Sequence, residues 1–121
     1  MANEISAYVS LAASKNGANI SSGQLSATDD MAGDQMTYNV QAVGITAEAV
    51  ALGDVSTIGY ALFKNMDPTN FVELALDSAV STQIFAKLLP GDIALVPLKT
   101  ATIYAKADTA GVNLLVAAVE R

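Results

Sequence analysis

Hydrophobic and polar residues alternate along most of this chain with the period of two that is typical of β-strands. In residues 5–14, ISAYVSLAAS, every second position is apolar and the positions between them are mostly Ser and Tyr. The pair Asn16-Gly17 follows, and it is preferred in tight type I′ hairpin turns because both residues tolerate positive φ. We therefore expect a short second strand, residues 18–22, to pair back on the first.

The remainder of the chain predicts further strands separated by turns. Residues 23–35 are polar and contain several glycines, so they predict a long loop. Residues 36–52 alternate at first and then gain Ala and Glu, which favour helix; we prefer a strand, because the alternation continues and no helix cap precedes it. Further strands are expected at 55–64, 71–77, 84–89, 93–99, 100–107 and 112–120. About eight to ten short strands with a turn every 8 to 12 residues predict an all-β sandwich or barrel as a single domain, residues 1–121.

The last predicted strand is apolar on both of its faces. Its residues fall into two sets, Val112, Leu114 and Val116 on one face and Leu115, Ala117 and Val119 on the other. No predicted helix is available to cover a second apolar face, so the strand predicts a core on one side and another sheet or subunit on the other. The candidate contacts to a partner or to further copies are Val112, Leu114, Leu115, Val116 and Ala117.

The composition of the chain also favours a protein that is partly covered by other subunits. The chain is 52% hydrophobic and only 15% charged, against about a quarter charged in a usual soluble domain. A surface with so little charge favours a homo-oligomer, in which other subunits cover part of it. The net charge of −6 and the scattered basic residues disfavour a nucleic-acid partner. The apolar run LLVAAV is too short to span a bilayer, so no membrane partner is expected.

Little in the sequence can carry catalysis. The chain has no His and no Cys, which removes the usual base at neutral pH and thiolate nucleophiles. Neither a G-x-S-x-G elbow nor a phosphate-binding glycine loop is present. No enzyme activity and no cofactor are expected. A glycosidase is disfavoured because the chain has no Trp to stack on sugars.

Three small groups of residues have two interpretations each. Asp29, Asp30 and Asp34 could bind a hard cation such as Ca²⁺, but their spacing does not match an EF-hand and a solvated loop is the preferred reading. Aromatic side chains in the strands indicate core and cross-strand packing rather than a ligand platform: Tyr60, Phe63 and Tyr104. Two lysines within or at the ends of apolar strands indicate either snorkelling or protection of a sheet edge: Lys64 and Lys106.

Residues 56–120 also carry a recognisable set of motifs. They are a Gly-Tyr-hydrophobic strand ending in Lys-Asn, a Pro-Gly-acidic turn and the segment YAKADTA before the last strand, within STIGYALFKNMDPTNFVELALD, FAKLLPGDIALVPL and TIYAKADTAGVNLLVAAVE. In these motifs the chain resembles small virion structural proteins of tailed bacteriophages. The first 55 residues carry no comparable motif.

This resemblance implies an antiparallel β-sandwich, jelly-roll-like, that is made in the host cytoplasm and sits in the virion as a homo-oligomer. Capsid decoration proteins of this kind commonly bind as trimers over the lattice of the major capsid protein, and no catalytic residues are carried over. The alternatives are a tail, neck or host-binding component and, less favoured, a carbohydrate-binding β-sandwich module. A tail-tube protein would need a long hairpin or arm, for which residues 23–35 are the only candidate in the sequence.

Overall fold

The computed structural model describes residues 3–121, and these residues form strands, turns and loops without a helix. The strands are β1 (Ile5–Val9), β2 (Ala12–Lys15), β3 (Ala18–Ser21), β4 (Leu25–Asp29), β5 (Met36–Val43), β6 (Glu48–Ala49), β7 (Ile58–Asn65), β8 (Val72–Ala75), β9 (Ile84–Leu88), β10 (Ile93–Pro97), β11 (Tyr104–Ala107) and β12 (Val112–Glu120). The predicted all-β class is confirmed. Within the described residues no helix could cross a membrane.

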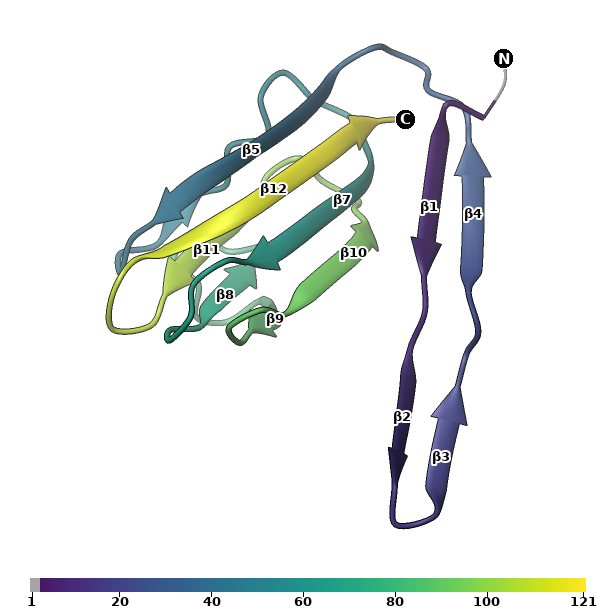
Figure 1. Ribbon diagram of the computed structural model, residues 1–121. Coiled ribbons are helices and arrows are strands. Elements are labelled where there is room, and N and C mark those ends of the chain that lie inside the picture. Colours follow the sequence, from purple (N-terminus) through teal and green to yellow (C-terminus); the bar gives the residue numbers. More distant parts are fainter. Residues whose placement is uncertain (1–2) are drawn as a thin grey trace.

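Strands β5 to β12 form a sandwich of two four-stranded antiparallel sheets (Figure 1). One sheet has the order β10-β7-β12-β5 and the other β6-β11-β8-β9. If strands β5 to β12 are renumbered one to eight in chain order, the first sheet has the order six-three-eight-one and the second has the order two-seven-four-five. That is the strand order of a jelly roll, so the predicted jelly-roll-like sandwich is confirmed by topology.

The core lies between the two sheets and is filled largely by every second residue of β7 and β12, whereas β5 contributes only Val43 to it. Alternation is regular in β7 and β12, where Phe63, Leu114 and Val116 are each 0% exposed. Leu74 and Ile103 meet them from the opposite side of the cluster. The period-two pattern of the sequence thus places one face of β7 and one face of β12 in the interior, as expected for strands packed on one side.

One polar side chain is fully buried in this core. Asn65, at the end of β7, donates from Nδ2 to the carbonyl oxygens of Asn70 and Leu88, both at 2.9 Å, and accepts from the Asp67 amide at 2.8 Å. Its backbone amide also donates to the carbonyl of Asp92. Leu88 is the last residue of β9 and the other partners lie outside the strands, so Asn65 ties the end of a neighbouring strand and two loops to the end of a central strand.

Residues 5–29 form a long hairpin that lies outside the sandwich, and we call it the arm (Figure 1). In it β1 pairs with β4 and β2 pairs with β3, both antiparallel. Asn16 and Gly17 turn the chain with φ of 50° and 86°, the positive values that a type I′ turn requires. The predicted hairpin is confirmed. The predicted loop at 23–35 is wrong over residues 25–29, because this polar segment pairs with β1 although almost nothing in it is buried.

Two other sequence expectations are corrected. The strand predicted through residues 45–52 is interrupted, with only Glu48–Ala49 in a ladder, because the chain crosses here from one sheet to the other. Gln41 of β5 fixes this crossing by hydrogen bonds with the backbone of Ala49 and Ala51. Lys64 and Lys106 do not protect sheet edges, since β7 and β11 each have a strand on both sides. Snorkelling remains the interpretation for both lysines.

Candidate functional site

The outward side of the sheet β10-β7-β12-β5 is almost entirely apolar. The registers of the three strand pairs align twelve of its outward side chains in three rows across the sheet, and the pair Ala42 and Asn113 lies beyond them. We call these twelve residues the outer face: Met36, Val119, Tyr60 and Pro97; Tyr38, Ala117, Leu62 and Leu95; Val40, Leu115, Lys64 and Ile93. Lys64 is the single charged member. Three of the apolar members are strongly exposed, with Tyr38 at 75%, Ile93 at 66% and Met36 at 63%.

The other sheet of the sandwich has a different outward side. There Lys106 of β11 stands opposite Glu73 of β8, and Glu73 stands opposite Lys87 of β9. The ammonium group of Lys87 also lies 4.2 Å from the centre of the Phe71 ring. Alternating charge across neighbouring strands is typical of a sheet face in contact with water. The contrast marks the outer face as the unusual surface of the sandwich, because exposed apolar patches commonly mark interaction sites.

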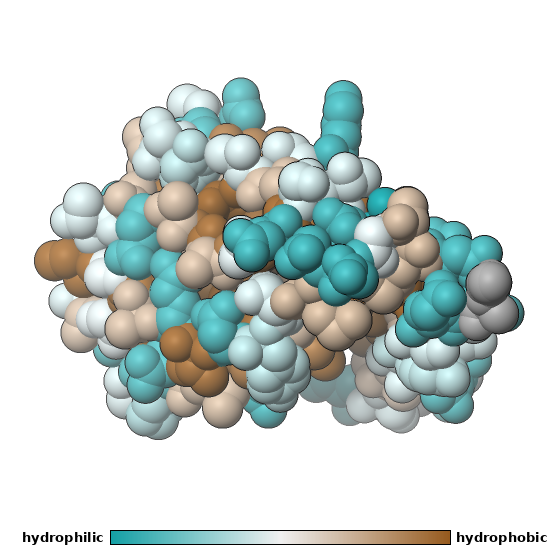
Figure 2. All heavy atoms as spheres, turned by 90° about the horizontal axis from the view of Figure 1, so that it is seen from above, coloured by the Kyte–Doolittle hydropathy of each residue, from teal (hydrophilic) through white to brown (hydrophobic). Residues whose placement is uncertain are grey.

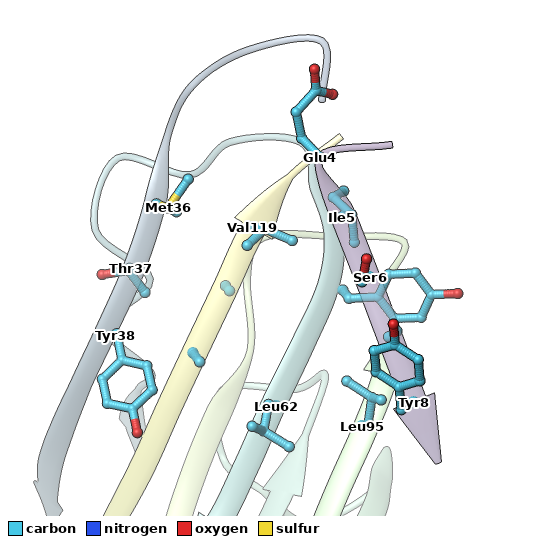
Figure 3. Close-up of a pocket in the computed structure, with 14 residues that line it drawn as sticks. Glu4, Ile5, Ser6, Tyr8, Met36, Thr37, Tyr38, Leu62, Leu95 and Val119 are labelled. Carbon is cyan, nitrogen blue, oxygen red and sulfur yellow. The ribbon is translucent and has the colours of Figure 1, made fainter. Parts of the chain in front are cut away.

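A groove of about 620 Å³ lies between β1 of the arm and the outer face (Figure 3). Tyr8 of the arm and Tyr38 of β5 stand on opposite sides of it, and Leu62 and Leu95 lie between them. Among residues 3–121, no charged side chain apart from Glu4 lines it. The groove is therefore suited to apolar side chains rather than to an ion or a phosphate.

The base of the arm is fixed to the sandwich at one end of this groove. Ile5 is 5% exposed and packs against Gly59, where an added Cβ would lie 3.3 Å from the Ile5 side chain. Arg121 forms an ion pair with Asp29 at 2.8 Å and lies over the Tyr60 ring at 5.7 Å. Seen from this end of the molecule, hydrophilic residues gather over its middle (Figure 2).

Beyond its base the arm has no core of its own. Cross-strand partners share a face, so Ala7, Ala27, Val9 and Leu25 lie on one face of the β1–β4 ladder and Ser6, Thr28, Tyr8 and Ser26 on the other. Five large hydrophobic side chains of the arm remain at least half exposed: Tyr8 at 59%, Val9 at 50%, Leu11 at 65%, Ile20 at 59% and Leu25 at 56%. The chain thus has two uncovered apolar surfaces, one on the arm and one on the sandwich.

The five candidate contact residues of the last strand divide between the two sides of the sheet. Val112, Leu114 and Val116 point into the core and are at most 2% exposed, so they are held by the sandwich itself. Leu115 and Ala117 lie in the middle of the outer face and are half-buried. They are the members of the predicted set that remain candidates for contact with a partner.

The three loop aspartates are not brought together. Asp29 is paired with Arg121, Asp30 accepts from the Asn3 amide at 2.5 Å, and Asp34 accepts from the Gln35 side chain at 3.2 Å. Among residues 3–121, no group of three or more His, Cys, Asp or Glu side chains could hold a metal ion. Of the aromatic residues, Phe63 is in the core, whereas Tyr60 lies in the outer face and Tyr104 is half-buried on β11.

Two other aspartates organise turns of the sandwich. Hydrogen bonds from the backbone amides of Asn70 and Thr69 lower the pKa of Asp67 below its ordinary value of 3.8. Desolvation acts to raise the pKa of Asp77, but amide donors at Gln83, Ser81 and Thr82 outweigh it and the pKa is lowered. Both carboxylates close loops on their own backbone, a structural role with no reacting group nearby.

Sequence reasoning found β12 but missed most of the outer face. Tyr38 and Val40 belong to the well-alternating stretch of β5. The alternation does not tell which side of that strand faces the core, so it could not predict that these two side chains are exposed. The signal that could have been used is that β7 and β10 each carry apolar residues at both parities, whereas β5 carries Thr37, Asn39 and Gln41 on the side away from its exposed apolar residues. That property, shared with β12, would have extended the two-sided strand into a two-sided sheet.

Comparison with known proteins adds little to this description. No family model and no curated protein matches the sequence. Among solved structures, the chain is similar to a cupin superfamily protein from Desulfitobacterium hafniense DCB-2, with 17% sequence identity and a TM-score of 0.41. The similarity covers 95% of this chain and 79% of that chain. The jelly-roll assignment follows from the strand order given above.

Proposed function

We propose that this chain is a structural protein of a tailed-bacteriophage particle, and specifically a capsid decoration protein that binds between subunits of the major capsid protein. The observation that carries the proposal is the outer face, where eleven of twelve outward side chains are apolar. The virion-like motifs of residues 56–120 agree with it. In this role the protein acts by adhesion and performs no catalysis.

The mechanism would be burial of apolar area at seams of the head. Each Å² of apolar surface removed from water contributes about 25 cal/mol, and repetition over many copies makes the sum large. The sparse charge of the outer face keeps the cost of desolvation low. Because the site on the capsid would exist only in the intact lattice, binding would stabilise that lattice by mass action.

The test is to compare heads with and without the protein. Heads that carry it are expected to release DNA at a higher temperature than stripped heads, and electron microscopy should place it on the capsid surface. A triple change of the outer face, Tyr38→Ser, Val40→Ser and Ile93→Ser, should abolish binding to heads. Equal release temperatures with and without the protein would remove the decoration role.

A second candidate, a tail or neck component, is favoured by the arm. Proteins that stack or form tubes need a segment that reaches a neighbour, and residues 5–29 form such a segment (Figure 1). The same micrographs separate the two candidates, because a tail component would be found along the tail or at the neck and not over the capsid lattice.

A further inference from the structure

The chain exposes more surface than a compact protein of its mass. Its accessible surface is 7100 Å², whereas a compact monomer of 12.4 kDa is expected to expose roughly 6,100 Å². The excess of about 1,000 Å² is close to the roughly 800 Å² that one partner contributes to an interface of standard size. A second protein surface covering the arm would remove such an excess.

The arm also needs a partner on energetic grounds. A two-stranded hairpin in water is marginally stable at best, since it has no third strand or packed face. Here the unsupported part runs from β2 to β3, where every strand residue is exposed. Nothing within the described chain packs on this end of the hairpin, which extends past the sandwich in Figure 1. A hairpin of this kind is expected to be stable only if its apolar side lies against another molecule.

The distribution of charge indicates which surface of a second copy the arm could contact. Between Ser6 and Thr28 the arm carries a single charged residue, Lys15, and the outer face carries only Lys64. The acidic residues that give the net charge of −6 lie instead in the sandwich loops, on its other sheet, at the arm base and, for Glu120, at the end of β12. Two copies that meet through these two surfaces would therefore avoid most of their mutual repulsion.

We propose that the arm of one copy packs on the outer face of a second copy. The arm supplies the apolar side chains Val9, Leu11 and Leu25, and the outer face supplies Tyr38, Val40 and Ile93. The contact joins two different surfaces of the same chain, so it is head-to-tail and gives a closed ring when the rotation between copies closes. This inference does not depend on the proposed virion role.

The dimensions favour a ring over an isolated pair. With strands about 4.8 Å apart and a rise of about 3.3 Å per residue, the outer face covers roughly 14 by 16 Å. One arm on that patch buries less than the roughly 1,200 Å² expected at the low end of stable interfaces. In a closed ring every copy gives an arm and accepts one, which doubles the buried area per subunit.

The test uses sedimentation velocity on the full chain in the absence of any phage component. The wild type is expected to sediment as an oligomer at micromolar concentration. Leu25→Asp on the arm and Val40→Asp on the outer face are each expected to sediment as monomers. Two matched controls should keep the oligomer: Ser26→Asp, on the opposite side of the same arm strand, and Ile45→Asp, which is 55% exposed like Val40 but lies outside both surfaces.

Mixing gives the decisive result. Leu25→Asp keeps an intact outer face and Val40→Asp keeps an intact arm, so an equimolar mixture can form one arm-to-face contact per pair although neither variant associates alone. Because one such contact is smaller than a stable interface, we expect a weak dimer whose fraction increases with protein concentration. A monomeric wild type, a mixture that stays monomeric at every protein concentration, or controls that lose the oligomer equally would overturn the proposal. The arm of a second copy would cover the outer face that the proposed capsid contact also uses, so one outer face can make only one of the two contacts at a time. Sedimentation without phage components tests the contact between copies and binding to heads tests the capsid contact, so the failure of either proposal is seen separately.

Cross-linking keeps the test informative if an aspartate variant does not fold. The chain has no cysteine, so Leu25→Cys and Val40→Cys can be made as single-thiol proteins and joined by a short bis-maleimide. The mixture of these two is expected to give covalent heterodimers, whereas Ile45→Cys mixed with Leu25→Cys should give none. Equal yields from the two mixtures would contradict the proposed contact.

Discussion

The sandwich and the arm are built from similar strand-forming residues but are stabilised in different ways. In the sandwich one face of β7 and one face of β12 are buried, down to 0% exposure at Phe63 and Leu114. In the arm the same alternation exists, yet Val9 and Leu25 stay at least half exposed. Alternation therefore defines which side chains share a face, whereas burial depends on whether a second layer is present.

The largest expected difference between the regions comes from removing a large side chain in each. Phe63→Ala should lower the free energy of unfolding by about 3–5 kcal/mol, because it leaves a cavity in the core. At protein concentrations low enough for the chain to be monomeric, Leu25→Ala, in the arm, should change it by less than about 0.5 kcal/mol, the usual range for exposed sites. Urea unfolding of the two variants measures both values. Comparable losses would mean that the arm folds as part of the sandwich core.

Asn65 tests whether the sandwich, unlike the arm, is also stabilised by buried polar contacts. Asn65→Ala leaves two carbonyls and one amide without their partner, at a cost of about 1–3 kcal/mol for a group left unsatisfied. The matched arm variant is Asn19→Ala, at an exposed position of β3, and it should be close to neutral. Thermal unfolding compares the two, and an Asn65→Ala protein as stable as the wild type would show that water replaces these hydrogen bonds.

Acid should weaken the sandwich through Asp67 and Asp77. The pKa of each is lower in the folded chain than its ordinary value of 3.8, so each stabilises the fold above that pH and loses this contribution as the pH falls through the folded pKa. We expect the midpoint temperature of thermal unfolding to fall when the pH is lowered below about 4. In the double variant Asp67→Asn and Asp77→Asn this drop should be smaller, and an unchanged acid dependence would assign it to other carboxylates.

The sequence predicted the local features of both regions and not their place in the molecule. Asn16-Gly17 predicted the arm turn because the pair determines backbone conformation by itself. The strand at 25–29 was missed, since a polar segment that pairs without being buried has no hydrophobic pattern to reveal it. The interruption at residues 45–52 depends on a crossing between sheets, which is a tertiary feature.

The candidate site, like the fold, could be predicted from the sequence only in part. The two-sided pattern of β12 predicted an apolar surface beyond the core, and Leu115 and Ala117 do lie on it. Which side of the strand faced the core could not be read from β12 alone, because both sides are equally apolar. The neighbours of that surface, such as Tyr38 and Ile93, required the registers of three strand pairs, which join residues far apart in the chain.

Hydrogen exchange of the arm amides tests the central claim most directly, namely that the arm is held by a second copy and the sandwich is held by its own core. At high protein concentration, amides of β2 and β3 are expected to exchange slowly in the wild type. They should become fast on dilution and in Val40→Asp, while the amides of β7 and β12 remain protected throughout. Arm protection that is unchanged by dilution and by Val40→Asp would contradict the account.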